Sequence, residues 1–200
     1  MTKHNVNYHL RDKQEAMVEA WEKAFDGLEN VRISQGEIMQ VKADAIISPA
    51  NSFGFMDGGI DLVYSKFFGY QLQQELQSLI IREHNGELLV GQALILLTNN
   101  DFIPYLISAP TMRLPMDVSD TINAYLAFRA SIIAVNKFNG TNPNPIKSVL
   151  CPGLCTATGN MPYTRAARQM AIAYRNVALD QLKTPFHPAY LMNEHYRLIR

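Results

Sequence analysis

The first clear pattern along the chain is a helical one, between residues 12 and 28. Apolar residues recur there every three or four positions, at Ala16, Met17, Ala20, Ala24 and Phe25. This spacing places them on one face of an amphipathic helix, and Gly27 follows as a common stop signal. We therefore expect a leading helix near the N-terminus.

Short runs rich in valine, isoleucine and leucine predict strands at residues 31–34, 45–48, 92–97, 105–108 and 146–151. The run at 45–48 lacks alternation, which is typical of a strand buried on both faces. Longer periodic stretches predict helices at residues 60–68, 70–83, 119–137 and 162–179. Ser119 suits the N-cap of the third helix, and Pro162 suits the first turn of the fourth.

Strands and helices alternate along the chain, and this order predicts an α/β fold. We expect a three-layer α/β/α sandwich with a mixed, largely parallel central sheet. The prediction divides the chain into an N-terminal helical extension (1–30), the main domain (31–180) and a C-terminal arm (181–200). The last twenty residues show no clear period, and we expect the arm to pack on the domain or on a partner, where it could support an oligomer.

The amino-acid composition limits the kinds of binding partner that we expect. Lys and Arg together number 18, as do Asp and Glu, so no net charge attracts nucleic acid or an anionic membrane. Two cysteines are too few for a disulfide framework. The first residues lack the apolar stretch of a secretory signal, and no apolar run reaches membrane-spanning length. We therefore expect a soluble, cytoplasmic protein without a metal or cofactor.

Two loops that follow strands and precede helices carry the candidate chemistry, at residues 49–59 and 152–161. Gly58 and Gly59 come just before a predicted helix, so backbone N–H groups and the positive helix end would face the sheet edge where α/β proteins bind ligands. Thr156, Thr158 and Gly159 stand in the equivalent place in the second loop. Two such loops can hold a compact anion with backbone dipoles alone. Gly-Lys-Ser/Thr and dinucleotide fingerprints are absent from the sequence.

The sequence around these loops resembles the macro domain family. The first half of the resemblance is the run QGEIMQVKADAIISPANSFGFMDGGIDLVYSKFFG, and the second is the run CPGLCTATGNMPYTRAARQMAIAY. The first contains the family's turn, strand end and glycine-rich loop in order, at residues 36–38, 48–51 and 58–61. The resemblance spans about residues 31–180 and implies a macro-like, ADP-ribose-binding domain.

The resemblance also implies a role for individual residues. Glu37 stands where the family's aspartate binds the adenine amino group, and Asn51 stands where an asparagine holds the distal ribose. Asn51 and Asp61 are the catalytic candidates. The implied ligand-binding set is Glu37, Ile38, Ala50, Asn51, Gly58, Gly59, Ile60, Thr156, Ala157, Thr158, Gly159 and Asn160. On residue type alone, Asn51 also suits an ordinary turn, and Asp61 also suits the first turn of a helix.

Several departures from the family pattern bear on activity. Ser65 stands where hydrolytic members often have histidine, Ser48 replaces the first asparagine of the strand end, and Cys155 and Ala157 occupy positions that are commonly glycine. Three readings stay open: an enzyme that hydrolyses an ADP-ribosyl bond or ADP-ribose-1″-phosphate, a non-catalytic ADP-ribose or nucleotide reader, and a structural protein with a vestigial cleft. Nucleic acid is expected only as an ADP-ribosylated substrate.

Two further sets of residues have alternative interpretations. Cys151 ends a predicted strand and is more typical of a core residue than of a nucleophile, and Cys155 is less certain because a loop carries it. Tyr174, Phe53 and Phe55 are candidates for stacking on adenine, although aromatic residues on helices usually belong to the core.

Overall fold

A computed structural model describes residues 5–182 and 187–200, and it contains a six-stranded sheet in the order β2-β1-β6-β3-β5-β4. All neighbouring strands are parallel except β4 and β5, which are antiparallel. The predicted mixed, largely parallel sheet is therefore confirmed. The strands are β1 (Asn7–Asp12), β2 (Val31–Gln35), β3 (Ala45–Ser48), β4 (Leu94–Leu97), β5 (Tyr105–Ser108) and β6 (Ser148–Cys151).

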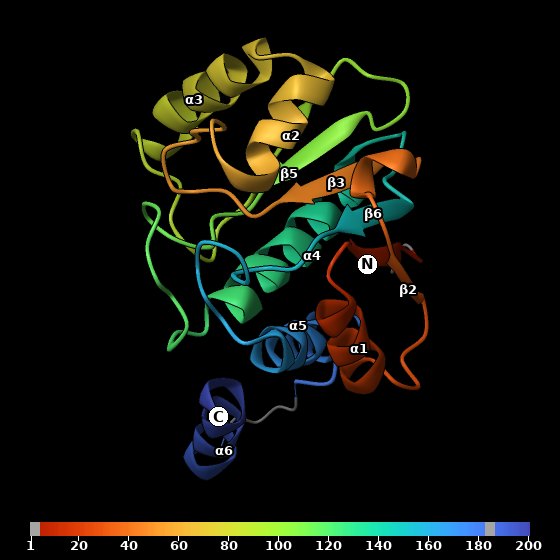
Figure 1. Ribbon diagram of the computed structural model, residues 1–200, viewed down its shortest axis with the longest axis vertical. Helices are drawn as coiled ribbons and strands as arrows, with labels where there is room; N and C mark the ends of the chain where they lie inside the picture. The colour runs from red at the N-terminus through yellow and green to blue at the C-terminus, as the bar shows by residue number, and fades with distance from the viewer. Residues whose placement is uncertain (1–4, 183–186) are drawn as a thin grey trace.

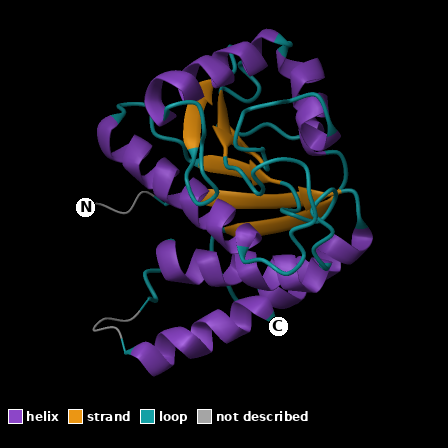
Figure 2. Ribbon diagram, turned by 90° about the vertical axis from the view of Figure 1, so that its left-hand side faces the viewer, coloured by secondary structure: helices purple, strands orange, loops and turns teal. Residues whose placement is uncertain are grey.

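Helices cover both faces of this sheet (Figures 1 and 2). One layer contains α2 (Gly59–Phe68) and α3 (Gln71–His84), and the other contains α1 (Glu15–Ala24), α4 (Asn123–Thr141) and α5 (Tyr163–Val177). A short helix, η1 (Ile38–Gln40), follows β2. The last helix, α6 (Pro188–Ile199), lies outside these layers and packs on α5. The three-layer sandwich is thus also confirmed.

The core is divided in two by the sheet, and the pleat of β3 shows how. Ala45 and Ile47 of β3 belong to the cluster under α1, α4 and α5, whereas Ile46 belongs to the cluster under α2 and α3. All three are fully buried. Side chains alternate across a strand, so a strand between two helix layers needs apolar residues at every position. The uninterrupted apolar run of β3 therefore reflects its central place.

The N-terminal segment is more than the helical extension that the sequence predicts for residues 1–30. It contains β1, which lies between β2 and β6 in the interior of the sheet. Tyr8 and Leu10 of β1 are buried in the core, while His9 and Arg11 on the other face are partly exposed. The sheet of this protein therefore depends on a strand that precedes α1.

Two further expectations about helices are corrected by the structure. Helix α4 begins at Asn123 with Ile122 as its N-cap, so Ser119 lies in the preceding turn and is not the cap. Pro162 is the N-cap residue of α5 rather than part of its first turn. The C-terminal arm shows no clear period in the sequence, yet its residues 188–199 form α6, which packs on α5. The part of that arm at 183–186 lies outside the described residues.

Candidate ligand-binding site

A cleft of about 480 Å³ opens where the carboxyl ends of β1, β3 and β6 meet the two loops singled out in the sequence. Such an edge is the usual place for a ligand in an open α/β sheet. The lining residues come from four segments: Asp12 and Gln14; Pro49, Ala50, Asn51, Phe55, Asp57, Gly58, Gly59, Ile60 and Asp61; Thr111, Met112 and Pro115; and Pro152, Gly153, Cys155, Thr156, Ala157, Thr158, Gly159 and Tyr163.

The first loop ends on the N-terminus of α2. Gly58 is the N-cap residue and makes no side-chain cap, and the carbonyl of Gly58 accepts the helical bond from the N–H of Leu62 at 3.1 Å. Helix geometry therefore leaves the N–H groups of Gly59, Ile60 and Asp61 without a partner inside the helix. Gly59 has a φ of +53°, a left-handed conformation that glycine adopts without strain. The positive end of α2 thus faces the cleft.

The second loop turns tightly after β6. The N–H of Met161 donates to the carbonyl of Cys155 at 3.0 Å, and the N–H of Asn160 donates to the carbonyl of Ala157 at 3.0 Å. These bonds leave Ala157 and Thr158 exposed at the tip of the loop. Gly159 is held closely, because a Cβ there would stand 2.5 Å from the carbonyl oxygen of Cys155. Gly159 is required by packing.

Asp61 is the buried carboxyl group of the cleft, with 7% of its surface exposed. The Ser48 hydroxyl donates a hydrogen bond to the Asp61 carboxylate at 2.5 Å. Burial raises the pKa of Asp61 to about 6, and the bond from Ser48 opposes that shift. A carboxyl group with such a pKa can exchange a proton near neutral pH.

The side chain of Asn51 is occupied by its own loop. Its Oδ1 accepts bonds from the N–H groups of Phe53 at 3.1 Å and Phe55 at 3.2 Å, and its Nδ2 donates to the carbonyl of Phe55 at 2.8 Å. The turn role that the residue type suggests is therefore present. Asn51 also lines the cleft, so a ligand contact is compatible with this role.

Glu37, which the resemblance assigns to the adenine end, lies outside the cleft lining, and so does Ile38. The Glu37 carboxylate is exposed and forms an ion pair with Lys13 at 2.6 Å. The reason is topological: Glu37 follows β2 at the edge of the sheet, and β1 separates that strand from β6.

Asp12 follows β1, next to β6, and does line the cleft. Its carboxylate accepts bonds from the N–H groups of Gly153 and Gln14, both at 3.0 Å. Sequence reasoning missed Asp12 because it missed β1. A signal existed in the acidic residue that follows the alternation of Tyr8 and Leu10. Asn160 is also outside the lining, and its side chain donates to the Asp117 carboxylate at 3.0 Å.

A comparison with protein families identifies this arrangement. The family model of the macro domain matches residues 47–170, more than half of the chain. This chain belongs to the macro domain family. A relative from Aquifex aeolicus, named only as an uncharacterized protein, is 30% identical over 141 residues, which are 70% of this chain and 78% of the relative. A macro domain-containing protein of Caldanaerobacter subterraneus subsp. tengcongensis is 29% identical over 142 residues, with 70% and 76% covered.

Solved structures agree with this fold. The macrodomain of Mycobacterium tuberculosis DarG matches with a TM-score of 0.60 and 19% identity, over 72% of this chain and 88% of that one. A mutant of the Oceanobacillus iheyensis macrodomain with ADPR matches with a TM-score of 0.56 and 18% identity, over 69% and 73%. At such identities the likeness concerns the fold alone.

This macro domain places both thiols away from water. Cys151 is fully buried, and burial raises its pKa well above the ordinary value. Burial also raises the pKa of Cys155 to about 12. Cys155 has a φ of +65°, a left-handed conformation that glycine adopts most readily. This agrees with the glycine that the family pattern commonly has at this loop position. Neither thiol has the depressed pKa of a nucleophile.

The three aromatic residues that could stack on adenine lie in different surroundings. Tyr174 is 2% exposed, packs edge-on against Tyr8, and donates its hydroxyl to the carbonyl of Glu29 at 2.7 Å. This residue belongs to the core, so the structure contradicts a stacking role for it. Phe53 lies under the Arg113 guanidinium at 5.0 Å. Phe55 is exposed and lines the cleft, and it is the candidate of the three that a base could reach.

No group of three or more His, Cys, Asp or Glu side chains among residues 5–182 and 187–200 could hold a metal ion. Over the same residues, no helix has the length and apolar character needed to cross a membrane. The cleft is lined by the backbone of the two loops, by threonine hydroxyls and by the carboxylates of Asp12, Asp57 and Asp61.

Proposed function

We propose that the cleft binds ADP-ribose or an ADP-ribose derivative, with the diphosphate between the N-terminus of α2 and the second loop. The observation that carries the proposal is that both backbone cradles, around Gly59 and around Thr158, line one cavity. A helix N-terminus and a loop of backbone N–H groups both favour anions. Two similar solved structures, the Oceanobacillus iheyensis macrodomain mutant with ADPR and the macrodomain with ADP, support the same ligand class.

Size and energy are consistent with this ligand. The cavity, at about 480 Å³, falls in the range of roughly 300–1,000 Å³ that small-molecule sites occupy. A hydrogen bond to a charged group contributes about 1.5–3 kcal/mol, so several backbone N–H groups can hold a diphosphate without arginine. The balanced charge of the chain is therefore no obstacle.

For the base end we propose Asp12 in place of Glu37. A carboxylate accepts the hydrogen bond that an adenine amino group donates. Asp12 lines the cleft beside Gly153 of the second loop, whereas Glu37 pairs with Lys13 outside the lining. Each Asp12 oxygen already accepts one backbone bond and keeps a second lone-pair direction. Asp12 can therefore accept from a base without losing its hold on the loop.

For the distal ribose we propose Asn51 and Asp61. Asn51 Nδ2 gives one hydrogen to the carbonyl of Phe55, and a second hydrogen remains on the same nitrogen. Asp61 follows Gly59 and Ile60 in the first turn of α2, so its carboxylate lies beside the cradle of the first loop.

Calorimetric titration of ADP-ribose tests the binding proposal. We expect micromolar-range affinity in the wild type and at least about tenfold weaker binding in Ala157→Glu, because a carboxylate at the tip of the second loop repels the phosphates. Ala157 is preferable to Gly159 for this purpose because it is exposed and Gly159 is closely packed. Ala189→Glu, an exposed substitution in the first turn of α6, is the matched control. Equal affinity in all three proteins would refute the site.

The Asp12 assignment has its own test. Asp12→Ala should bring the affinities for ADP-ribose and for its hypoxanthine analogue, which lacks the amino group, close together. Glu37→Ala should leave the preference of the wild type unchanged. If the preference instead depended on Glu37, the base would lie at the edge of the sheet and the assignment would be wrong.

A second candidate function, hydrolysis of an ADP-ribosyl bond or of ADP-ribose-1″-phosphate, is favoured by Asp61. Its carboxyl group lines the cleft with a pKa near 6, so its ionised form at pH 7 can accept a proton from an attacking water. Turnover should be assayed on ADP-ribosylated protein, on ADP-ribosylated DNA and on ADP-ribose-1″-phosphate. Loss of turnover in Asp61→Asn with binding retained would support a hydrolytic function. Absence of turnover by the wild type would instead indicate a non-catalytic ADP-ribose reader.

A further inference from the structure

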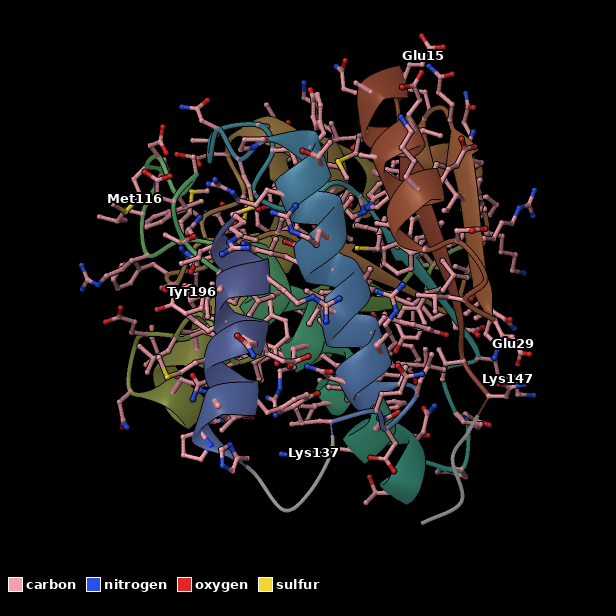
Figure 3. The ribbon with its side chains drawn as sticks, turned by 90° about the horizontal axis from the view of Figure 1, so that it is seen from below. Glu15, Glu29, Met116, Lys137, Lys147 and Tyr196 are labelled. Carbon is pink, nitrogen blue, oxygen red and sulfur yellow. The ribbon has the colours of Figure 1, made fainter. Side chains whose placement is uncertain are left out.

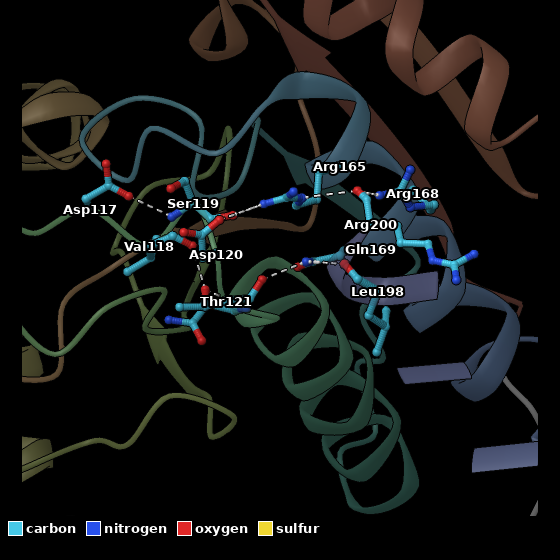
Figure 4. Close-up of polar contacts among 11 residues, drawn as sticks. Asp117, Val118, Ser119, Asp120, Thr121, Arg165, Arg168, Gln169, Leu198 and Arg200 are labelled. Carbon is cyan, nitrogen blue, oxygen red and sulfur yellow. Dashed lines mark hydrogen bonds and ion pairs between the residues drawn. The ribbon is translucent and has the colours of Figure 1, made fainter. Parts of the chain in front are cut away.

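Polar contacts connect the C-terminal helix α6 to the second loop of the cleft through side chains of α5. The connection passes through residues 117–121, which we call the bridging segment. Figure 4 shows the contacts of α5 with the end of α6 and with the bridging segment, and Figure 3 shows α6 alongside α5. The contacts fall into three steps: from α6 to α5, from α5 to the bridging segment, and from there to the loop.

The first step is at the C-terminal end of α6. Arg168 of α5 donates its Nε to the carbonyl of Arg197 at 2.8 Å and its Nη2 to the carbonyl of Arg200. Gln169 donates its Nε2 to the carbonyl of Leu198 at 2.8 Å. The last carbonyl groups of a helix lack partners within it and favour cations. Side chains of α5 thus satisfy the end of α6.

The second step joins α5 to the bridging segment through side chains that also contact α6. Arg165 donates its Nη1 to the carbonyl of Ser119 at 2.6 Å and lies 3.3 Å from the Asp120 carboxylate, while its Nε donates to the carbonyl of Arg200 at 3.3 Å. Buried Gln169 donates to the carbonyl of Thr121 at 2.8 Å. One arginine and one glutamine therefore hold both segments at once.

The third step reaches the loop itself. The N–H of Val118 donates to the carbonyl of Gly159 at 3.0 Å, and the Asn160 side chain donates to the Asp117 carboxylate at 3.0 Å. Val118 is buried, and its Cγ2 would stand 2.7 Å from a Cβ at position 159. The bridging segment therefore supports the base of the second loop from behind.

We infer that Arg165 is a positioning residue, through which docking of α6 holds the second loop in its ligand-binding conformation. The consequence for ligand binding rests on the proposed function; the consequence for the loop does not. Arg165 lies outside the cleft lining and acts through Ser119 and the backbone of Val118. A loop that is held before the ligand arrives loses less conformational entropy on binding. The C-terminal arm thereby contributes to affinity without touching the ligand.

The experiment measures hydrogen exchange of the free protein and ADP-ribose affinity in the full chain. Arg165→Ala removes the connection, and Leu198→Asp undocks the buried residue at the end of α6 while leaving Arg165 in place. Arg175→Ala is the matched control, because Arg175 is on the same helix but donates to the carbonyl of Ala24. Arg165→Lys tests whether a positive charge on one nitrogen, without the planar fork of the guanidinium, restores part of the effect.

We expect amides of residues 117–121 and 155–160 to exchange about three- to tenfold faster in Arg165→Ala and Leu198→Asp, with ADP-ribose affinity reduced by a similar factor. Exchange in β3 should not change, which distinguishes positioning from general destabilisation. Unchanged exchange at 155–160 in either variant, or an equal effect of Arg175→Ala, would overturn the inference. If the wild type bound no ADP-ribose, the proposed function would fail, and the exchange data would still decide this inference.

Discussion

The hydroxyl of Ser48, at the end of β3, donates a hydrogen bond of 2.5 Å to the carboxylate of Asp61 in the first turn of α2. Both residues are buried, so the carboxylate gives up most of its hydration for this one side-chain bond. Burial outweighs the bond, which is why the pKa of Asp61 rises to about 6 from its usual 3.8. The site therefore contains an acid that costs stability when it ionises.

This shift predicts a specific dependence of stability on pH. Because the folded-state pKa is raised, the unfolded chain ionises first, and stability is lost as pH rises from about 4 through about 6. Since one pKa unit corresponds to 1.36 kcal/mol, the loss is on the order of 2–3 kcal/mol. Asp61→Asn should remove it, so urea denaturation between pH 4 and pH 8 should show a smaller decline for the variant than for the wild type.

Asp57→Asn is the matched control for this measurement. Asp57 is on the same loop but exposed, so neutralising it should leave the pH profile of the wild type intact. If Asp61→Asn and the wild type declined in parallel, the carboxyl group would have an ordinary pKa in the folded protein.

The sequence predicted those parts of the molecule whose signals are local. The run at 45–48 indicates a buried strand by itself, and Gly58 and Gly59 before an amphipathic stretch indicate a helix start that faces a ligand. Strand β1 has a weaker signal, because its alternation is limited to Val6, Tyr8 and Leu10, and its position beside β6 depends on contacts distant in sequence. Because β1 was not predicted, Asp12 was not recognised as a residue of the cleft, and Glu37, which lies outside the lining, was expected there instead.

Replacing Leu10 should measure how much the fold depends on β1. Leu10 is 0% exposed within the core under α1 and α5, so Leu10→Ala should lower the free energy of unfolding by about 2–5 kcal/mol. Ile81→Ala removes a comparable side chain that is 68% exposed, and this control should cost less than about 0.5 kcal/mol. Urea denaturation with matched m-values gives both numbers. A small effect of Leu10→Ala would mean that β1 is dispensable to the domain.

The two thiols should be inert in the folded protein. Burial raises the pKa of Cys155 to about 12 and that of Cys151 well above its ordinary value, so both remain protonated at pH 8. Mass spectrometry after iodoacetamide treatment should find neither residue alkylated in native buffer and both alkylated in denaturant. Rapid native alkylation of Cys155 would show that its loop opens readily.

The role of the first loop can be separated from its contribution to stability by comparing two glycines. Gly59 and Gly86 both have positive φ, at +53° and +91°, and at each position an added Cβ would meet nothing within 4 Å. Substitution by alanine should therefore cost each protein about 1–2 kcal/mol from the left-handed conformation alone. Gly59 lines the cleft, where the proposed function has its backbone N–H face the diphosphate, whereas Gly86 follows α3 away from the lining. Gly59→Ala should weaken ADP-ribose binding at least about fivefold beyond Gly86→Ala, because relaxation of the strained residue turns that N–H away.

Calorimetric titration of the two variants beside the wild type, with their urea denaturation curves, gives both the loss of affinity and the loss of stability. Equal affinities would place the phosphate-binding groups in the second loop alone.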